Sequence, residues 1–110
     1  MGALTVDTEA EVRVGAEAPL VHLCPHVDEV DYGTVRIEWT TAGKTIELHS
    51  LRAWLQSFAK VVVSHEQVTD LIREELAGLE GIEDVDVTSD WTTAGMEVRC
   101  STSPTRVGKP

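Results

Sequence analysis

Hydrophobic and polar positions alternate near the middle of the chain. A period of two is typical of a β-strand that buries one of its faces, and such a strand is predicted over residues 33–41. Its buried face is predicted to consist of Val35, Ile37 and Trp39. Residues 40–43 then predict a turn, because Gly43 can adopt a positive φ angle. Residues 44–48 are predicted to return as the partner strand.

After residue 50 the apolar positions take the spacing of a helix. Two helices are predicted, because apolar residues recur three and four positions apart on both sides of the β-branched run 61–63. The first is expected to begin near His49 or Ser50, and the second at Ser64, which can form a capping box with Gln67. The apolar faces are predicted to be Leu51, Trp54, Leu55 and Phe58, and then Val68, Leu71, Ile72, Leu76 and Leu79.

A second hairpin is predicted after the helices. Its first strand should turn Val85, Val87 and Ser89 inward, and residues 96–100 should form the returning strand. The turn between them, Trp91–Gly95, repeats the sequence of Trp39–Gly43 letter for letter. We interpret the repeat as one turn chemistry used twice rather than as a binding motif.

The order of these elements predicts an α+β fold of the type ββααββ. Such a chain forms a four-stranded antiparallel sheet with both helices on one face. Its two open sheet edges favour closure of several subunits into a barrel. The polar and acidic residues 1–18 are predicted to be a flexible arm, residues 19–103 a single domain, and residues 104–110 a loose tail.

Composition and charge narrow the class of partner. The chain has 110 residues, 42% of them hydrophobic, and a formal net charge of −10. This charge argues against a duplex-binding protein and favours a small-molecule substrate. No apolar run is long enough to span a membrane. The two cysteines and the lack of an export signal lead us to expect reduced thiols and a cytoplasmic location.

The densest polar chemistry lies between His22 and Asp31. Cys24 is flanked at two positions on either side by His22 and His26, and histidines can promote the thiolate form of a nearby cysteine. The residues alone leave two possibilities open for Cys24, a nucleophile or a small buried residue. Asp31 could serve as a general acid and base or lie in a solvated acidic loop. No metal is expected, because the pattern does not complete four zinc ligands.

Two further groups of polar residues could carry chemistry. His65 and Glu66 open the second helix, where they could cap it or pass a proton and bind the N–H groups of a heterocycle. A second group surrounds the start of the first helix, where it could form a cap and a solvated face or bind an anion. This group consists of Glu47, His49, Ser50 and Arg52.

Together these residues resemble the QueF family of nitrile reductases, which belong to the tunnelling-fold (T-fold) superfamily. Cys24-Pro25 is followed by Asp31 at the spacing of that family, and His65-Glu66 matches its His-Glu pair. The run Glu47–Trp54 matches the family's hallmark run, with His49 and Arg52 at its two lysine positions. The two Gly-bearing hairpin tips also fit, so the resemblance extends from Val21 to Ser103.

The resemblance implies a T-fold that assembles into rings of five subunits, often stacked, with sites at the interfaces. It implies reduction of the nitrile of 7-cyano-7-deazaguanine by two NADPH through a covalent thioimide. The implied catalytic residues are Cys24, Asp31 and His65. The implied substrate-binding residues are Glu66, Glu47 and Leu48, and His49, Ser50 and Arg52 would lie on the NADPH side.

Two alternatives stay open within this fold. One is the QueF-like subfamily, in which ammonia attacks the same thioimide and forms an amidine on a tRNA base. The acidity of the chain argues against a tRNA partner. The other is a non-catalytic T-fold ring that binds a purine or a pterin.

Overall fold

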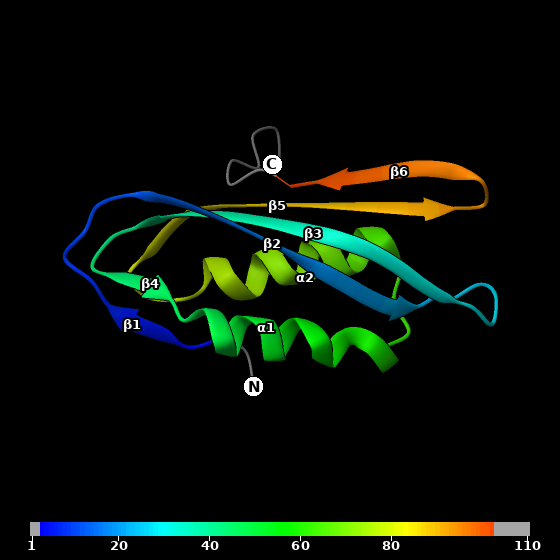
Figure 1. Ribbon diagram of the computed structural model, residues 1–110, viewed down its shortest axis with the longest axis horizontal. Helices are drawn as coiled ribbons and strands as arrows, with labels where there is room; N and C mark the ends of the chain where they lie inside the picture. The colour runs from blue at the N-terminus through cyan, green and yellow to red at the C-terminus, as the bar shows by residue number, and fades with distance from the viewer. Residues whose placement is uncertain (1–2, 103–110) are drawn as a thin grey trace, which may run out of the picture.

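The computed structural model describes residues 3–102, which form one four-stranded antiparallel sheet with both α-helices on one of its faces (Figure 1). The sheet order is β2 (Arg13–Leu23), β3 (Val30–Thr41), β5 (Ile82–Thr93) and β6 (Met96–Ser101). The helical layer consists of α1 (Leu48–Gln56), the 3₁₀-helix η1 (Ser57–Lys60) and α2 (His65–Ala77). Two short strands, β1 (Thr5–Asp7) and β4 (Lys44–Ile46), form a separate pair. The predicted α+β fold of ββααββ type is confirmed.

The first hairpin differs from the prediction. We expected residues 33–41 to pair with residues 44–48, but β3 pairs with β2 along the whole length of β2, and β4 pairs with β1. The sequence gives only a weak strand pattern for β2, because small residues such as Ala16 and Ala18 occupy the face that points toward the helices. After Gly43 the chain leaves the large sheet and buries Ile46 in the core.

The expected boundary at residue 18 falls inside β2. Within the described part of the predicted arm, residues 3–18, the chain is not a separate flexible segment, because residues 13–18 pair with β3 and β1 pairs with β4. Ala3 is also part of the hydrophobic core. The predicted loose tail, residues 104–110, lies outside the described residues.

The inward faces of the two central strands match the prediction. Val35, Ile37 and Trp39 in β3 are at most 1% exposed, and Val85, Val87 and Ser89 in β5 are at most 2% exposed. The helices cover this face with Leu51, Leu55 and Phe58, and with Val68, Ile72 and Leu76. Leu71 was predicted to be buried but is exposed, and Thr69 is buried instead. The Thr69 hydroxyl is accommodated by hydrogen bonds with the His65 carbonyl and the Ser89 hydroxyl, both at 2.6 Å.

The repeated pentapeptide places a buried tryptophan before a turn in both copies. Trp39 and Trp91 are 0% and 3% exposed. In the second copy Ala94 and Gly95 both have positive φ angles, as expected for a tight turn, and they join β5 to β6. Only this copy forms a hairpin tip, because the first copy leads into β4, which pairs with β1.

The capping predictions have mixed outcomes. Ser64 and Gln67 form the predicted capping box at the start of α2. The N-cap of α1 is Glu47 rather than His49 or Ser50. Within residues 3–102, neither helix has the length and apolar character that crossing a bilayer requires.

Candidate active site

Three chain segments meet at one end of the sheet, and they carry the residues predicted to be catalytic. These are the loop that joins β2 to β3 together with the first residues of β3, the start of α2 and the end of β5 (Figure 1). The backbone of Leu23 holds the first two together, because its N–H donates to the carbonyl of Val61 at 2.9 Å and its carbonyl accepts from the N–H of Val63 at 3.1 Å. The start of α2 is thereby fixed against the end of β2.

Cys24 is the first residue of the loop after β2 and is partly exposed. Its backbone N–H donates to the Glu29 carbonyl at 3.0 Å, and its Sγ accepts from the N–H of His26 at 3.5 Å. Because Leu23 pairs with Val30 in the β2–β3 register, Cys24 lies at the same sheet end as Asp31.

A chain of hydrogen bonds runs through two imidazoles beside Asp31. His22 Nδ1 lies 3.1 Å from the Leu23 carbonyl oxygen, and His22 Nε2 lies 2.9 Å from His65 Nδ1. His65 Nε2 lies 2.9 Å from the Thr93 hydroxyl. Asp31 Oδ2 lies 3.8 Å from His22 Nε2 and 4.0 Å from His65 Nε2. Of these, His22 is completely buried and Asp31 is only 6% exposed.

Trp91 holds both imidazoles in place from the end of β5. Its ring stacks on His65 with centroids 4.4 Å apart and meets His22 edge-on at 4.7 Å. Gly33 on β3 makes room for it, because a Cβ at Gly33 would come within 2.5 Å of the Trp91 ring. The indole N–H donates to the Ser89 hydroxyl at 2.8 Å, which fixes the ring further.

Burial lowers the pKa of His65, and the nearby carboxylate of Asp31 opposes this shift only in part. His65 therefore favours its neutral form at neutral pH, and its imidazolium form is a stronger acid than that of an exposed histidine. Such a group can accept and return a proton in the same reaction. The arrangement suits proton transfer close to Cys24.

Glu66 is exposed in the first turn of α2 and faces the open edge of the sheet at β6. It lines a hollow together with Thr69 and Val98. Its carboxylate is therefore available to a ligand at that edge, in line with the predicted substrate-binding role, which stays a prediction.

The residues predicted around the start of α1 do not join this group within one chain. The first turn of α1 lies beside β4, toward the other end of the long axis (Figure 1). The carboxylate of Glu47 accepts from the N–H groups of His49 and Ser50 at 2.9 and 2.8 Å. The Ser50 hydroxyl also has partners, because it accepts from the Leu4 N–H at 2.8 Å and donates to the Glu47 carbonyl at 2.9 Å.

The other three predicted residues in this region, Leu48, His49 and Arg52, have exposed side chains, and the Nδ1 atom of His49 lies 3.0 Å from the Glu47 carboxylate. The side chain of His49 is 95% exposed, and Leu48 is 55% exposed. Leu48 and Arg52 line an apolar hollow between α1 and β2, together with Ala16 and Ala18. These positions are compatible with a contact that completes a site in another subunit.

His22, Asp31 and His65 could also hold a metal ion. One ligand atom from each lies within 4.8 Å of the other two. The expectation of no metal rests on the sequence and stays a prediction.

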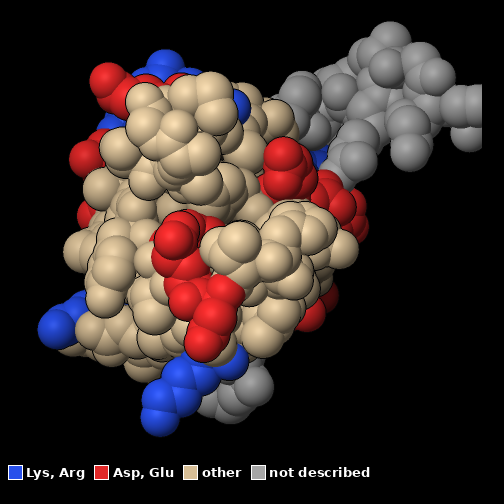
Figure 2. Space-filling view, turned by 90° about the vertical axis from the view of Figure 1, so that its right-hand side faces the viewer, with Lys and Arg blue, Asp and Glu red and all other residues tan. Residues whose placement is uncertain are grey.

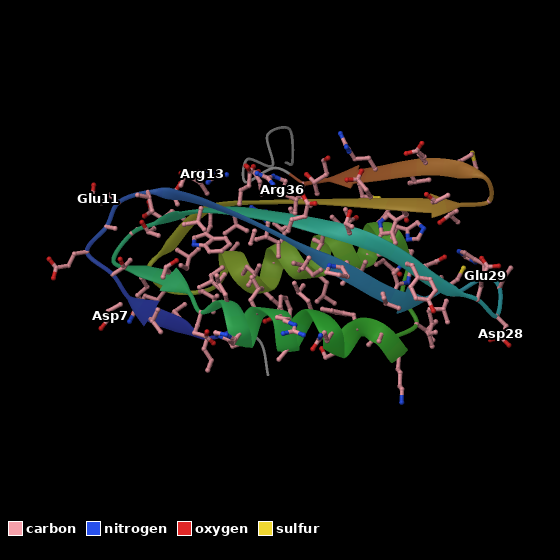
Figure 3. All side chains as sticks on the ribbon, viewed as in Figure 1. Asp7, Glu11, Arg13, Asp28, Glu29 and Arg36 are labelled. Carbon is pink, nitrogen blue, oxygen red and sulfur yellow. The ribbon has the colours of Figure 1, made fainter. Side chains whose placement is uncertain are left out.

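The surface around the sheet end that carries Cys24 is acidic. Asp28 and Glu29 project outward from the β2–β3 loop, whereas Arg13 and Arg36 lie on the sheet well away from it (Figure 3). In the view onto this end, carboxylates occupy the centre of the surface (Figure 2). An anionic ligand at Cys24 would therefore need positively charged side chains from outside this acidic surface.

Sequence reasoning missed three residues of this site. His22 was expected only to accompany Cys24, whereas Trp91 and Thr93 were taken as parts of a turn. A signal for His22 exists, because it follows Leu20 at the strand period and therefore points toward the helices. No comparable signal marks Trp91 and Thr93.

The fold and this site define a T-fold protein with a cysteine, an aspartate and a histidine at one end of the sheet. The profile of the QueF-like protein family matches residues 30–105, and the chain belongs to this family. The chain is 28% identical over 89 residues to the NADPH-dependent 7-cyano-7-deazaguanine reductase of Frankia casuarinae, covering 81% of this chain and 70% of that protein. It is 33% identical over 73 residues to the reductase of the same name from Rhodopirellula baltica, covering 66% of this chain and 60% of that protein.

A solved structure supports the fold. The apo form of the archaeosine synthase QueF-Like superposes with a TM-score of 0.78 over 82% of this chain and 90% of that chain. The two sequences are 20% identical, so this likeness concerns the fold alone.

The charged N-cap of α1 is expected to make the thermal stability of the protein depend on pH. Hydrogen bonds from His49 and Ser50 lower the pKa of Glu47 from 4.5 to about 2. A lowered pKa in the folded state means that the stabilisation is present above pH 4.5 and is lost as the pH falls through about 2. Glu47→Gln should therefore unfold at a lower temperature than the original protein at pH 7, and the difference should shrink toward pH 2.

Thermal unfolding followed by circular dichroism between pH 7 and pH 2 checks this prediction. Glu9→Gln, at an exposed position before β2, is the matched control and should leave the unfolding temperature unchanged. A difference for Glu47→Gln that stays constant over the whole range would contradict the role of the charged cap.

Proposed function

We propose that this protein reduces the nitrile of 7-cyano-7-deazaguanine to an aminomethyl group with NADPH, through a covalent thioimide on Cys24. One observation supports this most directly: a partly exposed thiol lies at the same sheet end as a buried aspartate and a mostly buried histidine, in a chain of the QueF-like family. The two relatives from Frankia and Rhodopirellula carry the name of this reaction.

In this proposal the sulfur of Cys24 forms a bond to the nitrile carbon, and the thiol proton passes to the nitrile nitrogen. Asp31 and His65 carry the protons of this and the following steps, because both lie at this end of the sheet and His65 Nε2 is 4.0 Å from Asp31 Oδ2. Glu66 accepts hydrogen bonds from the N–H groups of the heterocycle. NADPH supplies the hydrides, two in all, that convert the nitrile carbon to the amine level.

The cofactor contacts require a second subunit. A single chain carries His49 and Arg52 on α1, whose first turn lies toward the other end of the long axis from the β2–β3 loop (Figure 1). Its sheet has two open edges, β2 and β6, which can pair with neighbouring copies in a ring. In such a ring, the exposed His49 and Arg52 of one subunit would contact the phosphates of NADPH bound to a neighbouring subunit.

A second candidate is formation of an amidine by attack of ammonia on the same thioimide. The acidic surface at this end disfavours an anionic cofactor and therefore favours ammonia as the second reactant, on the free nitrile base rather than on a base in tRNA, whose phosphates the same surface would repel. Both candidates share Cys24, Asp31 and His65 and differ only after the thioimide has formed.

One experiment tests both candidates. The protein is mixed with 7-cyano-7-deazaguanine, and the intact mass is measured for an adduct before and after addition of NADPH. The reductase predicts an adduct, loss of NADPH absorbance at 340 nm and two NADPH oxidised per aminomethyl product. Parallel samples receive ammonium chloride in place of NADPH.

The outcomes separate the candidates. An adduct that is stable to NADPH but yields an amidine with ammonia would replace the reductase by the second candidate. Binding of the nitrile without any adduct would leave only a non-catalytic purine-binding ring.

A further inference from the structure

We propose that His22 is a positioning residue that fixes the tautomer of His65. In this arrangement His65 carries its proton on Nδ1, and its Nε2 is the atom that exchanges protons during the reaction. The catalytic consequence rests on the proposed function, whereas the tautomer is a property of the free protein and can be measured without any substrate.

The direction of each hydrogen bond in this chain follows from the Leu23 carbonyl oxygen, which can only accept. The Leu23 carbonyl has no proton to give, so His22 Nδ1 is the donor in their 3.1 Å contact. With His22 neutral, its Nε2 carries a lone pair and must accept in the 2.9 Å contact with His65 Nδ1. The proton of a neutral His65 therefore lies on Nδ1, and its Nε2 accepts from the Thr93 hydroxyl at 2.9 Å.

The surroundings leave the two rings little freedom to change this arrangement. His22 has no exposed surface, and the Trp91 ring contacts both imidazoles. The Thr69 hydroxyl donates to the His65 carbonyl at 2.6 Å and holds the backbone at the start of α2. A ring flip at His22 would remove both of its hydrogen bonds inside the protein, which is costly for buried polar groups.

The consequence for chemistry is that His65 can exchange a proton at one atom only. His65 Nε2 lies 4.0 Å from Asp31 Oδ2, so the two proton carriers face the same region. A proton that arrives at Nε2 gives an imidazolium, and the same proton leaves from Nε2, while the Nδ1 proton stays with His22. His22 thus acts through His65 and contacts neither the substrate nor the cofactor.

As the two rings stand, His22 Nε2 and His65 Nδ1 do not have the spacing of two ligands of one metal ion. Two nitrogen ligands bound about 2.0–2.1 Å from a tetrahedral zinc ion lie roughly 3.3 Å apart. His22 Nε2 and His65 Nδ1 are closer than this, at 2.9 Å, which is a hydrogen-bond distance. The geometry therefore favours a shared proton between the two rings over a shared ion.

Nuclear magnetic resonance of the ring nitrogens tests the proposal directly. Protein labelled with ¹⁵N-histidine contains four imidazoles, and His65→Gln identifies the signals of His65. Long-range proton–nitrogen spectra at pH 7.5 should show a protonated Nδ1 and an unprotonated Nε2 for His65. His65 in the opposite tautomer would overturn the proposal.

Three variants make the test specific. In His22→Gln the side-chain amide oxygen can replace Nε2 as the acceptor, so the His65 tautomer should be retained. In His22→Leu the acceptor is lost, and the His65 signals should move toward the tautomer with the proton on Nε2. His26→Gln, at an exposed neighbouring position, should leave the His65 signals unchanged. Unchanged signals in His22→Leu would overturn the proposal, and if that variant does not fold, the original protein and His22→Gln decide.

Two further measurements complete the test. The kcat of nitrile reduction should fall about 10-fold or more in His22→Leu with little change in KM, and His22→Gln should recover most of it. Equal losses in both variants would contradict a positioning role. Stoichiometric zinc in the purified protein would overturn the proposal in favour of a metal site. An enzyme without reductase activity but with the expected tautomer would refute the proposed function and leave the role of His22 toward His65 intact.

Discussion

Replacing Cys24 by alanine is expected to abolish the covalent adduct with 7-cyano-7-deazaguanine and to reduce turnover on the order of 10³-fold or more. The physical reason is that alanine leaves Asp31 and His65 in place but removes the atom that attacks the nitrile carbon. The variant should fold normally, because Cys24 lies on a partly exposed loop outside the hydrophobic core. Intact mass spectrometry measures the adduct, and NADPH absorbance measures turnover.

Cys100 provides the matched control for this prediction. Burial raises the pKa of its thiol, so Cys100 stays protonated at neutral pH and is a poor nucleophile. Cys100→Ala should still form the adduct, with the label on the peptide that contains Cys24. An adduct that survives in Cys24→Ala would show that the nucleophile has been assigned wrongly.

Gly33→Ala is expected to destabilise the protein by about 3 kcal/mol, at the upper end of the usual cost of overpacking. A Cβ at this position would lie 2.4 Å from the carbonyl oxygen of Asp90 and 2.5 Å from the Trp91 ring. Backbone and ring must therefore move apart, and the ring supports both His22 and His65. Urea unfolding measures the stability, and the histidine ring signals should shift in the same variant.

Gly78→Ala is the control for a glycine without such a contact. The nearest atoms to its added Cβ are 3.6 Å away, and its backbone lies in the right-handed helical region. This variant should change the stability by less than about 1 kcal/mol and leave the histidine signals unchanged. Similar losses in the two variants would mean that the close approach at Gly33 is not the cause.

The alternation of hydrophobic and polar residues and the helical spacing of apolar residues predicted those elements of the fold that depend on local sequence. Val35, Ile37 and Trp39 were correctly assigned to the core, because three large apolar residues at a period of two indicate the buried face of a β-strand. The β2 strand was missed because Ala16 and Ala18 give a weak hydrophobic signal. The partner strand of β3 was predicted wrongly for the same reason. The strongest strand signal nearby in the sequence was residues 44–48, which contain β4.

The sequence suggested candidate site residues but not their arrangement. Cys24, Asp31 and His65 were candidates from their chemistry and from the resemblance to the QueF family, and the structure brings their segments together through the contact of Leu23 with Val61. The separation of Glu47 and His49 from that end depends on how α1 packs across the sheet, which no local pattern encodes. The proton partner of His65 was missed for a related reason, because His22 contacts it across 43 residues of sequence.

The attachment of Leu23 also divides the site into a rigid part and an adaptable part. His22 and His65 are anchored by the sheet and by the start of α2, on both sides of this attachment. The loop from Cys24 to Glu29 lies beyond it and is connected internally by short hydrogen bonds of its own. In the proposed reaction, mutations in the loop would therefore change how the Cys24 thiol meets the nitrile and leave the contact between His22 and His65 in place, so the two properties could evolve independently.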